Sequence, residues 1–176
     1  MATQQKSFTG FPYGLGAPGV DALAVTADGI TLPQTTTKTL FTISGGPIEV
    51  MKIFGICTVA IGAVANATKL QAVISVNAAN VTTDICATVD INAMTLGSIY
   101  ELVTSSSTAA VISTVGLYPL ASSTVYYRFV MNVGSIIINC AGSDGGAGKI
   151  QWFMHYRPLS VGVSQAGLVQ ITSASS

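Results

Sequence analysis

The run KIQWFMHYRPL, from Lys149 to Leu159, alternates apolar and polar side chains more regularly than any other stretch of the chain. Side chains two residues apart share one face of a β-strand, whereas a helix needs a period near 3.6. The run therefore predicts a strand that ends at Pro158. One face of this strand is predicted to carry Ile150, Trp152, Met154 and Tyr156. The other face is predicted to carry Lys149, Gln151, Phe153, His155 and Arg157.

Further short runs of β-branched and aromatic residues precede it, and turn-forming residues separate them. The segment NAMTLGSIYELV has room for one helical turn, and no longer amphipathic helix is evident. The pattern predicts an all-β fold, an antiparallel β-sandwich or jelly roll of about eight to nine strands. The predicted strand segments are 35–44, 48–61, 65–76, 82–91, 98–103, 109–115, 124–133, 135–140 and 149–159.

Two of these runs make specific predictions about which side chains share a face. In TTTKTLFTIS, Phe41 and Ile43 are predicted to lie opposite Leu40. In TTDICATVDI, Ile85 is predicted to lie opposite Cys86, within one continuous strand. Both predictions assume uninterrupted alternation.

The first 34 residues differ from the rest because they mix aromatic residues, glycine and proline without a sustained period. We expect an extended N-terminal arm over residues 1–34, a β-sandwich over 35–160, and a C-terminal tail or peripheral strand over 161–176. The arm carries too many apolar side chains for a solvated tail, so we expect it to lie on its own domain or on a neighbour. The candidate interaction residues are Phe8, Phe11, Tyr13 and Leu15.

Charge is scarce in this sequence. Charged residues make up 8% of the 176 residues, seven of each sign, against about 25% in ordinary globular domains. Without a basic patch, nucleic-acid binding is not expected. The most apolar run, from Ile53 to Val64, is shorter than a membrane span, and the start of the chain lacks the apolar core of a signal peptide. A surface so poor in charge predicts that other protein covers part of it, with Ser and Thr on the remainder.

Two glycine-rich segments imitate nucleotide-binding motifs. A P-loop before Gly148-Lys149 would need Gly where Ser143 stands and Ser or Thr where Ile150 stands, and it would lead into a helix. GSDGGAGKIQW is therefore interpreted as a hairpin loop between SIIINC and KIQWFMHYR. GLGAPG matches the dinucleotide fingerprint, but it lies in the arm, outside any strand–helix context.

No set of residues predicts catalysis, a metal site or a cofactor. His155 is the only histidine and lies within a predicted strand, so a structural role is favoured over one in a triad. Asp84 and Asp90 would be about 20 Å apart on one strand, too far for paired acid–base chemistry. The cysteines lie in apolar runs and are interpreted as buried free thiols: Cys57, Cys86 and Cys140. Four aromatic residues could form a stacking platform for a sugar or a base, but on alternating strands they are interpreted as core: Trp152, Tyr126, Tyr127 and Phe129.

Four runs together resemble virion structural proteins of tailed bacteriophages: FTISGGPIEVMKIFGICTVAI, ATKLQAVISV, TTDICATVDINAMTLGSIYEL and GKIQWFMHYRPLS. The resemblance covers Thr37 to Leu159, and it is strongest to head decoration, or cement, proteins. It implies non-enzymatic β-sandwich subunits on the outside of the capsid, made in the host cytoplasm. The implied partners are the major capsid protein and the chain itself, commonly as a homotrimer. The arm is not matched by the resemblance.

Three other functional classes stay open. A free-standing pilin-like subunit or lectin is disfavoured, because the start of the chain lacks the apolar core of a signal peptide. A phage tail or fibre adhesin that binds a host surface glycan would be favoured by exposed aromatic residues on loops. An unfamiliar hydrolase would depend on His155, the only histidine.

Overall fold

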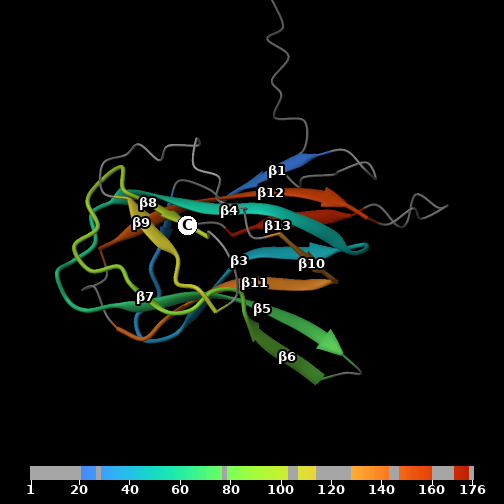
Figure 1. Ribbon diagram of the computed structural model, residues 1–176, viewed down its shortest axis with the longest axis horizontal. Helices are drawn as coiled ribbons and strands as arrows, with labels where there is room; N and C mark the ends of the chain where they lie inside the picture. Colours follow the sequence, from blue (N-terminus) through green and yellow to red (C-terminus); the bar gives the residue numbers. More distant parts are fainter. Residues whose placement is uncertain are drawn as a thin grey trace, which may run out of the picture.

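The chain folds into two antiparallel β-sheets packed face to face, as the alternating runs predict (Figure 1). The computed structural model describes residues 21–26, 29–76, 79–102, 107–113, 128–142, 147–159 and 169–174. These residues form thirteen strands and no helix. The strand count exceeds the predicted eight or nine for two reasons. Three strands, Ala22–Val25, Ile30–Thr31 and Gln170–Ser173, lie outside the predicted strand segments, and the predicted strand 82–91 is divided between Ala79–Asp84 and Val89–Asp90.

Sheet I is built around two long central strands, β4 (Ile48–Val59) and β12 (Lys149–Pro158). Its strand order is β1-β12-β4-β8-β9, with β2 also paired to β12 and β10 also paired to β4. The shorter strands are β1 (Ala22–Val25), β2 (Ile30–Thr31), β8 (Ile99–Glu101), β9 (Val111–Ser113) and β10 (Phe129–Met131).

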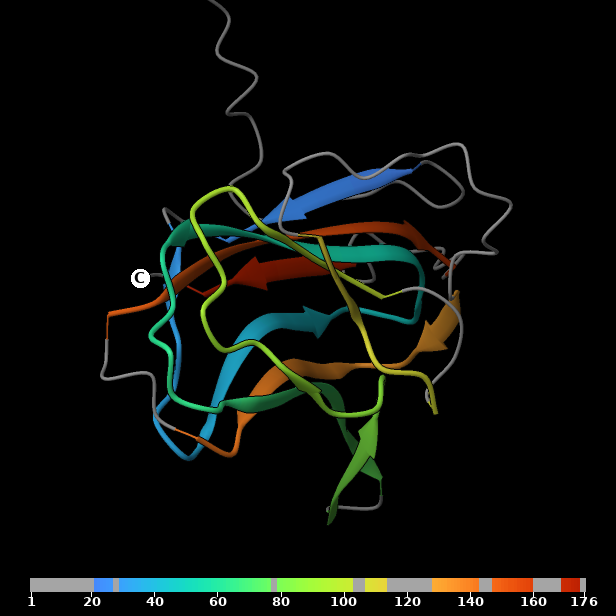
Figure 2. The ribbon, with the colours of Figure 1, turned by 60° about the vertical axis from the view of Figure 1, so that its left-hand side comes forward.

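Sheet II has the order β13-β3-β11-β5-β6, with β7 also paired to β5. Its strand β6 forms the outer edge of the lower layer, and the β5–β6 hairpin projects from the body of the sandwich (Figures 1 and 2). All six residues of β6 are exposed. The strands of this sheet are β3 (Thr37–Ser44), β5 (Ala67–Val76), β6 (Ala79–Asp84), β7 (Val89–Asp90), β11 (Gly134–Cys140) and β13 (Gln170–Ser173).

Successive strands often lie in opposite sheets. The chain passes from β3 to β4 to β5, and later from β10 to β11 to β12 to β13, with a change of sheet at each step. The interpretation of the glycine-rich segment before Lys149 as a hairpin loop is therefore wrong. It connects β11 of sheet II with β12 of sheet I, and these two strands do not pair with each other.

The core lies between the sheets, and β12 contributes much of it. Ile150, Trp152, Met154 and Tyr156 are all 0% exposed, which confirms the inward face predicted from the alternation. The Tyr100 ring meets the Trp152 ring edge to face, with centroids 5.2 Å apart. This geometry suits the ring quadrupoles of an aromatic pair.

Two predictions of side-chain facing are wrong. Leu40 and Phe41 are both fully buried, because the β3–β11 pairing shifts register there and a β-bulge turns adjacent side chains inward. Ile85 and Cys86 are likewise both buried, because β6 ends at Asp84 and a bend follows before β7 begins.

The chain ends differ in part from the expected arm and tail. Ala22–Val25 and Ile30–Thr31 fall inside the segment expected to be an extended arm, but they pair with β12 as β1 and β2. Near the other end, β13 pairs with β3 at the edge of sheet II, as expected for a peripheral strand.

Candidate interaction face

The outward side of sheet I carries a continuous row of side chains across five strands. Residues directly paired on neighbouring strands share a face, and the register aligns, strand by strand, Val25, Phe153, Phe54, Glu101 and Val111. We call the surface around this row the sheet I outer face. Its members are Leu23, Val25, Glu49, Lys52, Phe54, Ile56, Ile99, Glu101, Val111, Val130, Gln151, Phe153, His155 and Arg157.

Aromatic rings form the centre of this face. The rings of Phe54 and Phe153 stack with centroids 4.8 Å apart and an interplanar angle of 5°. The centroid of the His155 ring lies 6.4 Å from that of Phe54. His155 thus faces outward as predicted, but the face it shares is aromatic rather than polar. The centre of the face is therefore apolar and held in a fixed arrangement by strand pairing.

Exposed aliphatic side chains lie on other strands of this face. Leu23 on β1 is 47% exposed, Val130 on β10 is 66% exposed, and Val111 on β9 is 38% exposed. They lie on three different strands at the two sides of the sheet. An apolar surface that spans a sheet in this way is typical of a contact site for protein.

One charged pair is built into the face beside the rings. Glu101 lies on the outward side but is only 1% exposed, and its Oε1 lies 2.6 Å from Nζ of Lys52, which is 22% exposed. Lys52 Nζ also lies 5.3 Å from the centroid of the Phe54 ring, a cation–π contact. Glu101 Oε2 has no hydrogen-bond partner among the described residues. A buried carboxylate of this kind depends strongly on the cation that pairs with it.

The remaining charges of the face are neutralised at its Arg157 end. Arg157 Nη2 lies 2.8 Å from Asp21 Oδ1, and Arg157 Nη1 lies 3.7 Å from Glu49 Oε2. Arg128 Nη1 lies 3.8 Å from Glu49 Oε1. The hydrogen bond and charge of Asp21 raise the pKa of Arg157. With Lys52 and Glu101, the ion pairs on and beside the face contain three acidic and three basic residues, so exposed apolar groups are combined with balanced charge.

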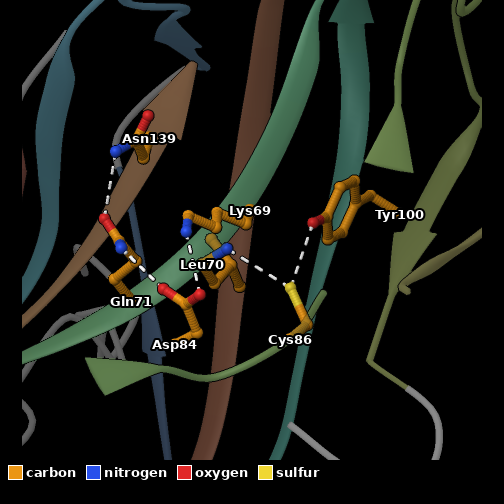
Figure 3. Close-up of polar contacts among 7 residues, drawn as sticks. All are labelled: Lys69, Leu70, Gln71, Asp84, Cys86, Tyr100 and Asn139. Carbon is orange, nitrogen blue, oxygen red and sulfur yellow. Dashed lines mark hydrogen bonds and ion pairs between the residues drawn. The ribbon is translucent and has the colours of Figure 1, made fainter. Parts of the chain in front are cut away.

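The outward side of sheet II has the opposite character. A polar ladder crosses three of its strands (Figure 3). Asn139 donates to Gln71 Oε1 at 3.1 Å, Gln71 donates to Asp84 Oδ1 at 2.7 Å, and Lys69 donates to Asp84 Oδ2 at 2.8 Å. The Lys69 and Gln71 bonds lower the pKa of Asp84. The groups of the ladder satisfy one another, as suits a solvated surface.

Sheet II also places threonine and serine on this side. The register aligns Thr172, Thr42, Ser135, Val73 and Thr82 in one row across five strands. Uncharged hydroxyls therefore form part of the outward surface of sheet II.

The cysteines are buried, as predicted, and all three are free thiols. Figure 3 shows Cys86 between Leu70 and Tyr100, and all three residues are buried. The Leu70 amide donates to Cys86 Sγ at 3.3 Å, and Cys86 Sγ lies 3.5 Å from the Tyr100 hydroxyl. Burial raises the pKa of Cys86 and Tyr100. A thiol held neutral in this way is a poor nucleophile.

A small hollow lies at the edge of the sandwich between β10 and the β5–β6 hairpin. Its volume is about 190 Å³, below the ~300–1,000 Å³ of pockets that hold drug-sized ligands. The hollow therefore suits a single side chain better than a substrate. Its lining residues are Ala72, Ile74, Thr83, Asp84, Ile85, Phe129, Val130 and Met131.

The structure brings few of the other candidates together. Asp84 and Asp90 lie on separate strands rather than on one, and both strands pair with β5. Within the described ranges, no three His, Cys, Asp or Glu side chains are grouped so as to hold a metal ion. In the same part of the chain, no helix is long and apolar enough to cross a membrane.

The predicted interaction residues Phe8, Phe11, Tyr13 and Leu15 lie outside the described residues. Sequence reasoning missed the sheet I outer face as a candidate site. The available signal was Phe153, an aromatic residue on the otherwise polar side of the KIQWFMHYRPL run. Its stacking partner Phe54 comes from a distant segment, so the pattern of one strand cannot reveal the pair.

Comparisons of the chain with protein-family models, with curated protein sequences and with solved structures find no match.

Proposed function

We propose that this chain is a non-enzymatic virion structural protein, a decoration or cement protein that binds the outside of a phage capsid and stabilises it. The proposed partners are the major capsid protein and further copies of the chain, in a homotrimer. The proposed location is the capsid exterior, after synthesis in the host cytoplasm. The observation that carries the proposal is the contrast between the apolar outer face of sheet I and the polar outer face of sheet II.

The strand order supports a jelly roll, a fold found in viral capsid domains and in lectin domains. Eight principal strands, numbered one to eight along the chain, are β1, β3, β4, β5, β6, β8, β11 and β12. In this numbering sheet I has the order 1-8-3-6 and sheet II the order 2-7-4-5. Two Greek keys folded over one another produce this order. Fold alone does not determine function, so the argument rests on the faces.

The two faces support a subunit that is covered on one side and solvated on the other. The sheet I outer face exposes Leu23, Val111 and Val130 and carries the stacked rings of Phe54 and Phe153. The outward side of sheet II carries the ladder from Asn139 to Asp84. A decoration protein has the same requirement, because one side must contact neighbours on the shell and the other must face solvent.

The size of the face supports multiple contacts rather than a single docking event. The face measures about 20 Å across its five strands and about 20 Å along them, the length of about six residues. Its area is therefore about 400 Å². A stable interface buries about 800 Å² on each partner. The face alone is too small, so further contacts are needed, from an arm or from several neighbours on a lattice.

A tail or fibre adhesin that binds a host glycan is the alternative. Loop aromatics would favour it, but every aromatic side chain among the described residues lies on a strand. Four of them are fully buried in the core: Phe41, Tyr100, Trp152 and Tyr156. These positions favour the decoration protein.

The proposal is tested with virions of the virus that encodes the chain. Quantitative mass spectrometry should find the protein in a fixed ratio to the major capsid protein, with a copy number in the hundreds. Particles stripped of it should bind the purified full-length chain again, and cryo-electron microscopy should place it on the capsid exterior. Heads that lack it should release DNA at lower temperature than decorated heads.

Two results would overturn the proposal. A few copies per particle, located on the tail, would identify the adhesin instead. Absence from purified virions would exclude a structural role.

A further inference from the structure

We propose that the sheet I outer face receives the N-terminal segment, residues 1–20, of a second copy of this chain. Phe11, Tyr13 and Leu15 are the side chains that pack on it. The inference deepens the proposed function and rests on it, since it names the surface through which neighbouring subunits hold one another.

The charge of the segment matches the charge of the face. Lys6 is the only charged side chain among residues 1–20. The charged side chains on the face already take part in ion pairs with one another or with adjacent residues: Glu49, Lys52, Glu101 and Arg157, with Asp21 and Arg128 beside them. Neither surface needs a charged group from the other, so an apolar, nearly uncharged segment can cover the face without leaving a new unpaired charge.

The spacing of apolar residues in the segment also matches the face. Phe11, Tyr13 and Leu15 are two residues apart, with Pro12 and Gly14 between them. In an extended chain they share one side and follow one another at about 6.7 Å, the spacing of alternate residues along a strand. An aromatic side chain buries about 150–250 Å². Two aromatics and a leucine therefore account for most of the face, whose area is about 400 Å².

The direction of β1 favours a second copy over the chain's own face. β1 is antiparallel to β12, with Ala22 opposite Tyr156 and Val25 opposite Phe153. An extended chain traced backward from Ala22 therefore leaves the face at its Arg157 end instead of crossing it. Tyr13 lies eight residues before Asp21, which gives a reach of up to about 27 Å. That reach is sufficient to contact a neighbouring subunit.

Disulfide cross-linking between two single variants of the full-length chain tests the inference. One population carries Tyr13→Cys and the other carries Leu23→Cys, and the native thiols are buried. After mixing, re-equilibration and mild oxidation, a cross-linked dimer of the two variants should form. The matched control replaces Leu23→Cys with Val81→Cys, on β6 of sheet II, because Val81 is 49% exposed and Leu23 is 47% exposed. The yield with Leu23→Cys should exceed the control at least tenfold.

A double variant, Tyr13→Cys with Leu23→Cys in one chain, distinguishes the two possible origins of the segment. Cross-links between chains support the inference, whereas cross-links only within one chain overturn it, because the segment then covers its own face. Equal yields for Leu23→Cys and Val81→Cys, or no cross-link at all, also overturn it. Capsid binding is measured separately on the unmodified chain, so either proposal can fail while the other stands.

Discussion

At the residue scale, Gly55 makes room for the largest side chains of the core. A Cβ at this position would lie 2.5 Å from Ile150 Cγ2 and 3.1 Å from the Trp152 ring. Gly55→Ala should therefore lower the free energy of unfolding by about 1–3 kcal/mol through overpacking. Urea denaturation followed by Trp152 fluorescence measures the change.

The same clash predicts coupling between two positions. In an Ile150→Ala background the closest obstacle is removed, so Gly55→Ala should cost less than in the parent chain. Additive effects of the two substitutions would show that the clash with Ile150 is relieved in another way.

The Lys52–Glu101 pair makes a second residue-scale prediction. Lys52→Met removes the cation that pairs with a carboxylate only 1% exposed. Breaking a buried pair from one side typically costs about 3–5 kcal/mol. The double variant Lys52→Met/Glu101→Gln carries no uncompensated charge, so it should be more stable than Lys52→Met alone.

Thermal unfolding of the parent, of the single variants Lys52→Met and Glu101→Gln, and of the double variant measures the coupling between Lys52 and Glu101. If Lys52→Met is as stable as the parent, Glu101 has access to solvent or another partner. The ion pair between Lys52 and Glu101 would then not contribute to the stability of the protein.

At the element scale, the β5–β6 hairpin depends partly on the Asp84 ladder. The hydrogen bonds from Lys69 and Gln71 lower the pKa of Asp84 relative to its ordinary value of 3.8. A carboxyl whose folded pKa is lower stabilises the fold at pH values above the unfolded pKa. That contribution is lost as the pH falls through the folded pKa. The pH window of the effect therefore lies below about pH 4.

Asp84→Asn should consequently lower stability at pH 6 and have no such effect below the folded pKa of Asp84. The side chain is 46% exposed, so the difference should stay within the ~0.2–1 kcal/mol of surface ion pairs. Urea denaturation from pH 2.5 to pH 7 measures it, with Lys69→Met as the companion variant. A difference that does not change with pH would mean that Asp84 acts through packing instead of charge.

Individual strands were predictable from the sequence to the extent that their alternation is uninterrupted. The inward face of β12 follows directly from its pattern, whereas the bulge that buries Leu40 beside Phe41 depends on pairing with β11. The alternation in SIYELV places Glu101 outward, but neither its burial nor its ion pair with Lys52 of another strand can be read from that pattern. Pairing partners, bulges and changes of sheet are tertiary properties, so local periodicity cannot specify them.

At the scale of the whole molecule, the distribution of charge determines how association should respond to salt. Six charged residues on and beside the sheet I outer face already form ion pairs within the subunit. Salt screens interactions between charges on different molecules, and it weakens association only where those interactions contribute. Contact through this face would instead depend on burial of apolar area, which sulfate strengthens.

Self-association of the full-length chain should therefore change less than about threefold between 0.05 and 1 M NaCl, and it should increase in ammonium sulfate. Sedimentation equilibrium over a range of protein concentrations measures the association constant in each salt. Leu23→Lys places a charge on the face and should weaken association, whereas Val81→Lys, at a similarly exposed position on β6, should not. Strong weakening by NaCl with no effect of Leu23→Lys would assign the contact to charged groups elsewhere on the molecule.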